Sequence, residues 1–349
     1  MLTSSKISNG INGSAKVPGD KSISHRSIII PSIAKGITEI NNILQSDDVI
    51  KTINAFKLMG VKILEKKNNL TIFGNGLYSL SKPKTRINLG NSGTTTRLLI
   101  GLLSAQNFSS SLYGDKSLSN RPMGRIINPL VEMGAKIESR KNTLPIKIIG
   151  NNLKGIDYEL DIASAQVKSG IALAALYSNN KTEIVEKNTT RDHTENMLKL
   201  FGANIQIKKI NQNKHIIING NKELKSKNIS VPNDLSSAAF FIVAALINEN
   251  SEIELKNINL NPTRCGFITA IKKMGAKILI KNKKENNGEI VGDINVKSSK
   301  LNGCELDKEM AKLMIDEFPI LSIAASFAST PSRFKGLEEL KVKESDRLE

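Results

Sequence analysis

The chain has 349 residues, 39% of them apolar, and no apolar run of about 18 residues that could span a bilayer. This length is enough for a well-formed core and predicts two domains. The formal net charge of +17 points to anionic partners. Nucleic acid is a poor match, because the basic residues are spread along the chain, aromatic residues make up only 4% and tryptophan is absent. A small polyanionic substrate explains the charge as well.

The N-terminus, the cysteines and the histidines narrow the protein class. Residues 1–20 lack the charged start and long apolar stretch of a signal peptide. Cys265 and Cys304 lack metal-ligand spacing, which is typical of reduced thiols in the cytosol. His25, His193 and His215 have no His or Cys partner at ligand spacing. We therefore expect a cytoplasmic protein with no metal and no other cofactor.

Arginine is used selectively in this chain. Forty lysines stand against ten arginines, so lysine is the default cation. Arginine offers a planar fork that binds phosphate and carboxylate through two parallel bonds, which lysine cannot do. The alternative is chance placement with surface salt bridges. Seven of the ten lie in turn-and-helix motifs and favour anion binding as a set: Arg26, Arg97, Arg121, Arg125, Arg191, Arg264 and Arg347.

One phrase recurs along the chain, as LMGVKI, EMGAKI, LFGANI and KMGAKI. Its glycines are 74, 68 and 73 residues apart. Each copy predicts the end of an amphipathic helix, a glycine cap and the start of a strand. Two further helix starts and a β-rich run precede each copy. The predicted first helices start at Ser22, Ser92, Ser164, Ser236 and Asp316, and the second helices at Ser46, Asn120, Arg191, Asn261 and Glu344.

The repeat predicts an α/β fold built from strand–helix–strand–helix–strand units. Three such units make one domain and six make two. Four complete units and part of a fifth are visible, so on this count the chain lacks the end of the fifth unit and the sixth. We expect a first domain over residues 20–229, and a second that joins 1–19 to 230–349.

The helix starts carry the candidate chemistry. Each helix N-terminus has free N–H groups and about half a positive charge. Equivalent helices that point the same way would bring these ends together into an anion trap, which we expect in a cleft between the two domains. The alternative for each motif alone is an ordinary cap, a glycine turn or an acidic residue that complements the helix dipole. The motifs are residues 18–26, 90–97, 164–169, 316–319 and 343–347.

Together these motifs resemble 5-enolpyruvylshikimate-3-phosphate synthases. The phrases PGDKSISHR, GNSGTTTRLL, NRPMGR, SAQVKS, TRDHTE, NPTR, DEFP and KVKESDRL occur in that family's order and spacing, over residues 7–349. The resemblance implies a monomer with a two-domain inside-out α/β barrel. It also implies transfer of the enolpyruvyl group of phosphoenolpyruvate to shikimate 3-phosphate, by addition and then loss of phosphate.

The resemblance also implies a role for each matching position. Asp316 would take the proton from the substrate hydroxyl, and Glu344 with Lys21 would deliver a proton to the enol methylene and later remove one. Phosphoenolpyruvate would contact Lys21, Gly93, Arg121, Gln166 and Arg347. Shikimate 3-phosphate would contact Lys21, Ser22, Arg26, Ser164, Ala165, Gln166, Arg191, Asp316 and Lys343.

The chain departs from the family pattern in two places. The family continues beyond Glu349 with a second phosphoenolpyruvate-binding Asp-His-Arg segment and a late lysine. Some members carry an Asn where this chain has Glu339, so that contact is not carried over. Gly93 matches the form of the family that the herbicide glyphosate inhibits.

Two other classes of protein compete with this interpretation. UDP-N-acetylglucosamine enolpyruvyl transferases share the fold and chemistry, but they usually carry a reactive cysteine after the second helix-start motif. Here the stretch from Asp115 to Arg125 has none. A basic nucleic-acid-binding repeat protein would show strong, salt-steep binding to DNA. A third alternative is an inactive structural fragment.

Overall fold

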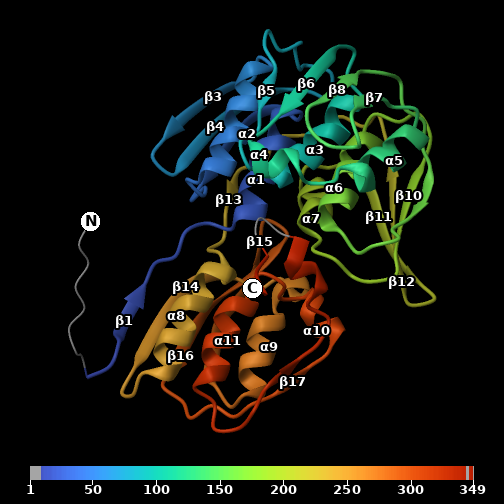
Figure 1. Cartoon of the computed structure of the whole chain (residues 1–349). Helices are drawn as coiled ribbons and strands as arrows, with labels where there is room; N and C mark the ends of the chain where they lie inside the picture. The colour runs from blue at the N-terminus through green and yellow to red at the C-terminus, as the bar shows by residue number, and fades with distance from the viewer. Residues whose placement is uncertain (1–8, 343–345, 349) are drawn as a thin grey trace. The chain divides into compact units, whose positions relative to one another are not determined.

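The computed structural model describes residues 9–342 and 346–348. The chain divides into two compact units (Figure 1). The continuous unit is Lys21–Val231, and the discontinuous unit joins Met1–Asp20 to Pro232–Glu349. Each unit has its own cluster of buried apolar side chains.

One sheet topology recurs in the described part of the chain. A short strand pairs in parallel with the next strand, which pairs with one arm of an antiparallel hairpin. The same order occurs in four sheets, three of them in the continuous unit. The first sheet has the order β13 (Ile229–Ser230), β2 (Lys35–Asn41), β4 (Asn69–Asn75) and β3 (Lys62–Lys66). The second has the order β5 (Ile87–Asn88), β6 (Ser109–Tyr113), β8 (Ile146–Ile149) and β7 (Lys136–Ser139). The third has the order β9 (Asp157–Glu159), β10 (Thr182–Glu186), β12 (Asn213–Asn219) and β11 (Asn204–Ile210).

The discontinuous unit repeats this arrangement with a strand from each of its two segments. The N-terminal strand β1 pairs in parallel with β14, so residues about 240 positions apart lie side by side, with Asn12 opposite Glu252. A second, two-stranded sheet contains β17 and β18. The bounds are β1 (Asn12–Ala15), β14 (Glu252–Asn259), β16 (Glu289–Lys297), β15 (Lys277–Asn286), β17 (Glu305–Leu306) and β18 (Arg333–Phe334).

Helices form the interior of the continuous unit. In α1, every residue from Ile23 to Ser32 is buried, and in α6 every residue from Val167 to Ala175. A helix that is buried all round belongs in a core, whereas strands such as β4 bury alternate residues on one face. Sheets outside and helices inside match the expected inside-out architecture. The helices of this unit are α1 (Lys21–Ser32), α2 (Asp47–Leu58), α3 (Gly93–Ser104), α4 (Lys116–Ser119), α5 (Gly124–Glu132), α6 (Ala165–Ala175) and α7 (His193–Leu200).

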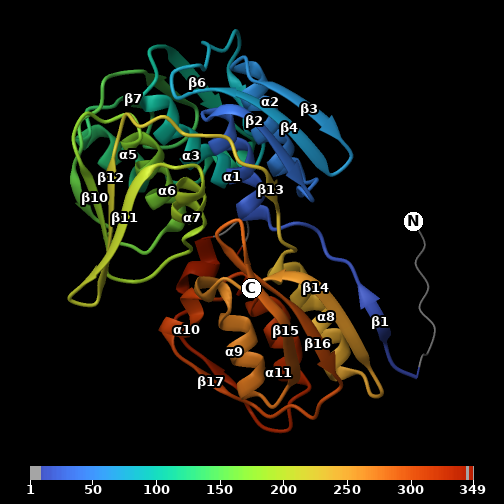
Figure 2. The same ribbon diagram turned by 180° about the vertical axis from the view of Figure 1, so that it is seen from behind.

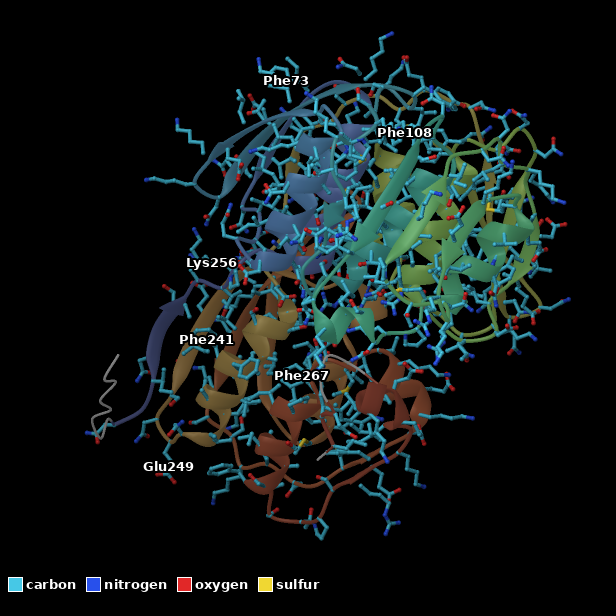
Figure 3. All side chains as sticks on the ribbon, turned by 45° about the horizontal axis from the view of Figure 1, so that its top comes forward. Phe73, Phe108, Phe241, Glu249, Lys256 and Phe267 are labelled. Atoms are coloured by element: carbon cyan, nitrogen blue, oxygen red, sulfur yellow. The ribbon has the colours of Figure 1, made fainter. Side chains whose placement is uncertain are left out.

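In the discontinuous unit, α8 packs on the four-stranded sheet, and α11 packs against α8 and α9; Figure 2 shows these elements from behind. Figure 3 labels one side chain on each of two helices: Phe267 of α9 is fully buried, whereas Phe241 of α8 is 42% exposed. No helix in the described ranges is both long and apolar enough to cross a membrane. The helices here are α8 (Leu235–Ile247), η1 (Pro262–Arg264), α9 (Gly266–Lys273), α10 (Lys308–Lys312), α11 (Phe318–Ser326) and η2 (Glu338–Val342).

The glycine of the recurring phrase ends the second helix in each of four units. Gly60, Gly134, Gly202 and Gly275 all have φ between 83° and 97°, in the left-handed region that glycine favours. The helices end two residues before each glycine, and a strand begins two residues after it. The expected third strand of each unit is the first arm of a hairpin, so the units hold one strand more than the sequence predicted.

Most expected helix starts lie within two residues of the observed ones. Ser46, Ser92 and Ser164 are N-cap residues, and the Ser92 and Ser164 side chains accept a backbone N–H. The helix predicted to start at Asn120 begins later in the structure, at Gly124, because Asn120 is the C-cap residue of α4. The start predicted at Glu344 lies outside the described residues.

The two segments of the discontinuous unit are joined where the chain leaves it and returns. The N–H of Asp20 donates to the carbonyl of Pro232, and the N–H of Asp234 donates to the carbonyl of Pro18, both at 2.8 Å. Gly19 and Asn233 form an antiparallel bridge between these bonds. These bonds therefore hold the two segments of the discontinuous unit together next to Lys21 and Val231, where the continuous unit begins and ends.

Gly101 of α3 allows the closest helix contact in the continuous unit's core. A Cβ at this position would lie 2.0 Å from the carbonyl oxygen of Gly170 in α6. We predict that Gly101→Ala destabilises the unit by about 3 kcal/mol, since backbone cannot yield as a flexible side chain can. Gly124→Ala is the control, because its Cβ would meet only the Asn142 side chain, at 3.4 Å. Hydrogen exchange of α3 and α6 amides in urea measures both, and equal protection in the two variants would contradict the prediction.

Candidate functional site

The start of α1 presents a cation and a buried arginine. The Lys21 side chain is 48% exposed and forms an ion pair with Asp48 of α2. Arg26 lies one turn later and is buried, with Nη1 donating to the carbonyl of Ser22 at 2.8 Å. Ser22 itself is half-buried. The i, i+4 spacing thus places Ser22 and Arg26 on one face of the helix.

Two hydroxyls from other helices hold the Arg26 guanidinium. Its Nε donates to Thr194 Oγ1 of α7 at 2.6 Å, and its Nη2 donates to Ser169 Oγ of α6 at 2.8 Å. The two hydroxyl oxygens are 2.6 Å apart, and Ser169 donates to the carbonyl of Ala165 at 2.6 Å. Because Ser169 uses its own proton there, Thr194 is the donor between the hydroxyls. The guanidinium is therefore fixed in plane and direction by α6 and α7.

Two more arginines flank the start of α3. A Cβ at Gly93 would lie 3.0 Å from Nη1 of both Arg97 and Arg121. Arg97 Nη1 donates to Gln166 Oε1 at 2.8 Å, and Gln166 Nε2 donates to Thr94 Oγ1 at 3.0 Å. The amide of Gln166 thus links α6 to α3. Of the predicted phosphoenolpyruvate residues, Gly93, Arg121 and Gln166 lie together here.

A buried polar network fixes the helix starts behind these arginines. His25 Nδ1 lies 2.8 Å from Thr52 Oγ1, which is 2.7 Å from Thr95 Oγ1. Thr95 in turn contacts Ser92 Oγ at 2.6 Å, and all four side chains are buried. The network joins α1, α2 and α3. His25 is therefore engaged in packing the helices, an arrangement that sequence spacing could not reveal.

The remaining predicted residues of the continuous unit also lie at helix starts. Ser164 caps α6 through its Oγ, which accepts the N–H of Val167 at 3.4 Å, and Ala165 is the first residue of that helix. Arg191 directly precedes Asp192, the N-cap of α7, and is half-buried. The starts of α1, α3, α6 and α7 thus carry the predicted substrate residues of this unit except Arg121, which lies between α4 and α5 with its guanidinium beside Gly93.

The discontinuous unit contains the other predicted residues. Asp316 lies two residues before α11, and Arg347 Nη1 donates to its Oδ1 at 3.2 Å. Lys343 and Glu344, the predicted ligand and proton carrier, lie outside the described residues. No group of three or more His, Cys, Asp and Glu side chains in residues 9–342 and 346–348 could hold a metal ion.

Sequence reasoning missed a buried charge cluster next to Asp316. Arg264, just before α9, forms an ion pair with Asp20 and lies 3.4 Å from Asp234 Oδ1 and 3.5 Å from Glu317 Oε1. Burial opposes its charge, but the carboxylates raise the pKa of Arg264. Burial raises the pKa of Asp234 even though Arg264 lowers it. Because arginine is scarce in this chain, the sequence singled out Arg264, but no pattern of nearby residues identified its partners.

Comparison with known proteins gives consistent matches over nearly the whole chain. A family described as EPSP synthase (3-phosphoshikimate 1-carboxyvinyltransferase) matches residues 5–349. The curated 3-phosphoshikimate 1-carboxyvinyltransferase of Ruthia magnifica subsp. Calyptogena magnifica is 50% identical over 99% of this chain and 78% of its own length. That of Thermoanaerobacter sp. (strain X514) is 50% identical over 97% and 79%. A solved EPSP synthase structure from Acinetobacter baumannii matches with a TM-score of 0.88 and 46% identity, over 97% of this chain and 76% of that one.

The Arg264 cluster gives a stability prediction. Arg264→Met would leave the buried carboxylates of Asp20 and Glu317 without their cation, so we expect a loss of about 3–5 kcal/mol. The control is Arg333→Met, whose partner Glu305 is 3.7 Å away and whose side chain is 72% exposed. This change should alter stability by no more than about 0.5 kcal/mol.

Urea-dependent hydrogen exchange of the α8 and α11 amides measures both variants within the same unit. An Arg264→Met protein as stable as the Arg333→Met protein would show that the cluster contributes nothing to stability.

Proposed function

The chain belongs to the EPSP synthase family, and we propose that the helix starts described above hold the substrates of its reaction. It transfers the enolpyruvyl group of phosphoenolpyruvate to shikimate 3-phosphate, a step of the shikimate pathway. Both substrates carry a phosphate ester and a carboxylate. The observation that carries the proposal is that Arg26 and Arg97 lie near the starts of α1 and α3, and that the Arg121 guanidinium lies beside the start of α3 in the same unit.

We assign shikimate 3-phosphate to the starts of α1, α6 and α7. The fixed guanidinium of Arg26 suits a phosphate, because its fork matches two phosphate oxygens. Ser22 lies on the same face of α1, and Gln166 reaches from α6 toward α3. The full proposed set is Lys21, Ser22, Arg26, Ser164, Ala165, Gln166, Arg191, Asp316 and Lys343.

Phosphoenolpyruvate is assigned to the arginines around Gly93. The missing side chain at Gly93 allows the guanidinium groups of Arg97 and Arg121 to lie close to the N-terminus of α3. An anion at this place would meet the free N–H groups of the helix as well as the guanidinium. The proposed set is Lys21, Gly93, Arg121, Gln166 and Arg347.

Three residues would move protons in the reaction. Asp316 would accept the proton of the 5-hydroxyl of shikimate 3-phosphate as the hydroxyl oxygen bonds to C2 of phosphoenolpyruvate. Lys21 and Glu344 would deliver a proton to C3 of phosphoenolpyruvate. The resulting tetrahedral ketal then loses a proton from C3 and phosphate from C2, which restores the double bond. Fixed cations around both anions would stabilise the charge that develops on the phosphate.

The cysteines support this assignment over the related UDP-N-acetylglucosamine enolpyruvyl transferases. Burial raises the pKa of Cys265 to about 11, and burial also raises the pKa of Cys304. At neutral pH both are therefore thiols rather than nucleophilic thiolates.

We further propose that the two compact units are the enzyme's domains, and that the enzyme acts as a monomer in the cytoplasm. The separate apolar clusters of the units support the first of these points, since a domain has its own core.

Calorimetric titration with shikimate 3-phosphate tests the assignment. We predict saturable binding of shikimate 3-phosphate and none of UDP-N-acetylglucosamine. Arg26→Lys should weaken binding by about 100-fold, because lysine cannot reproduce the contacts to Thr194 and Ser169 while binding phosphate. The control is Arg86→Lys, whose guanidinium lies 5.0 Å from the Tyr113 ring centre. Absence of heat from a chain that circular dichroism shows to be folded would refute the proposed function.

Gly93→Ala tests the second half of the site. The new methyl group would lie 3.0 Å from Nη1 of both Arg97 and Arg121, closer than ordinary packing allows. We predict about tenfold weaker binding of phosphoenolpyruvate at saturating shikimate 3-phosphate, with the affinity for shikimate 3-phosphate unchanged. Gly124→Ala should leave both affinities unchanged. Equal phosphoenolpyruvate affinity in the Gly93 and Gly124 variants would remove Gly93 from the site.

A further inference from the structure

Four charged side chains form a buried cluster beside the starts of α6 and α7. Lys168 Nζ lies 2.7 Å from Glu195 Oε1 and 3.0 Å from Glu186 Oε1, and none of these three side chains is exposed. Lys214, whose side chain is 18% exposed, lies 3.2 Å from Glu195 Oε1 and 3.8 Å from Glu186 Oε2. The cluster therefore holds two cations and two carboxylates.

Lys168 and Glu195 are held in their charged forms. Burial opposes the charge on Lys168, but the carboxylates of Glu195 and Glu186 raise its pKa above the ordinary value. Burial likewise opposes the charge on Glu195, but Lys168 and Lys214 lower its pKa. Such a cluster is a weak source of stability, because the cost of removing charges from water offsets their attraction, and apolar residues of similar size often serve as well. Its geometry is the more informative property.

The cluster connects the same two helices that hold Arg26. Lys168 directly precedes Ser169 on α6, and Glu195 directly follows Thr194 on α7. The helices are thus linked twice within one turn: through the ion pair, and through the hydroxyls 2.6 Å apart that bind the Arg26 guanidinium. An ion pair with no exposed atoms fixes the separation of its helices, and the hydroxyl pair sits one residue away from it on each helix.

We propose that Lys168 and Glu195 are positioning residues for shikimate 3-phosphate, acting through Ser169 and Thr194 on Arg26. This inference rests on the proposed function, since Arg26 is the residue assigned to the phosphate. Neither charged side chain touches the substrate. Their ion pair sets the distance between α6 and α7 at which both hydroxyls reach the guanidinium, and a displacement of about 1 Å would stretch one of the contacts of 2.6 and 2.8 Å beyond hydrogen-bond distance.

The test is the double variant Lys168→Met/Glu195→Gln. It replaces one cation and one carboxylate with uncharged side chains of similar volume, and it leaves Glu186 with Lys214. We expect a melting temperature within about 4 °C of the parent. Binding of shikimate 3-phosphate should weaken at least about tenfold. Binding of phosphoenolpyruvate at saturating shikimate 3-phosphate should not change. The matched control is Lys147→Met/Glu138→Gln, an exposed pair 3.1 Å apart on neighbouring strands of the same unit.

A second background separates positioning from a general effect on folding. In a Ser169→Ala/Thr194→Val protein the contacts to Arg26 are already absent, so adding the Lys168 and Glu195 changes should weaken binding no further. Additive losses would overturn the proposal, as would parental affinity in the Lys168→Met/Glu195→Gln protein. If that protein does not fold, Glu195→Gln alone, which keeps Lys168 beside Glu186, takes its place in both backgrounds. A folded parent that does not bind shikimate 3-phosphate would instead refute the proposed function.

Discussion

The architecture depends on one backbone constraint that recurs along the chain. A residue in the left-handed conformation lets a helix end and the chain turn into a strand within a few residues, and glycine adopts this conformation without a steric cost. Gly60, Gly134, Gly202 and Gly275 meet this requirement at equivalent places. Because the turn is the same each time, each unit returns its strands to a sheet of the same topology, and its two helices to the interior. The grouping of helix starts is a consequence of this repetition.

The charged groups of the interior fall into two kinds. Lys168 and Arg264 are surrounded by carboxylates, which compensate their charge and hold segments together. By contrast, the contacts that orient Arg26 come from the hydroxyls of Ser169 and Thr194 and from a backbone carbonyl. The ion-paired side chains thus link segments of the scaffold, while the hydroxyls of Ser169 and Thr194 set the direction of the Arg26 guanidinium.

What the sequence could predict was local or repeated. The caps at Ser46, Ser92 and Ser164 and the left-handed glycines follow from residue type and spacing, and the family and its reaction followed from the ordered motifs. The hairpin arm after each third strand was missed, because the turns before β4 and β12, Lys67-Asn68 and Asn211-Gln212, lack the glycine that marks a tight hairpin turn. The partners of Arg264 and Lys168 could not be predicted, since an ion pair between residues far apart in sequence leaves no periodic trace. The roles of the individual site residues remain proposals.

The parallel pairing of β1 with β14 has a consequence for synthesis on the ribosome. β1 leaves the ribosome early, yet its partner is translated about 240 residues later, with all of Lys21–Val231 in between. At about 5–20 residues per second, β1 waits for roughly 10–50 s. During this interval the continuous unit can complete its own core, so folding proceeds from the inserted unit to the unit that contains it. Strand β1 is thus among the last to find its place, and a strand that is short, uncharged and polar, with little apolar surface, suits a segment that must wait without aggregating.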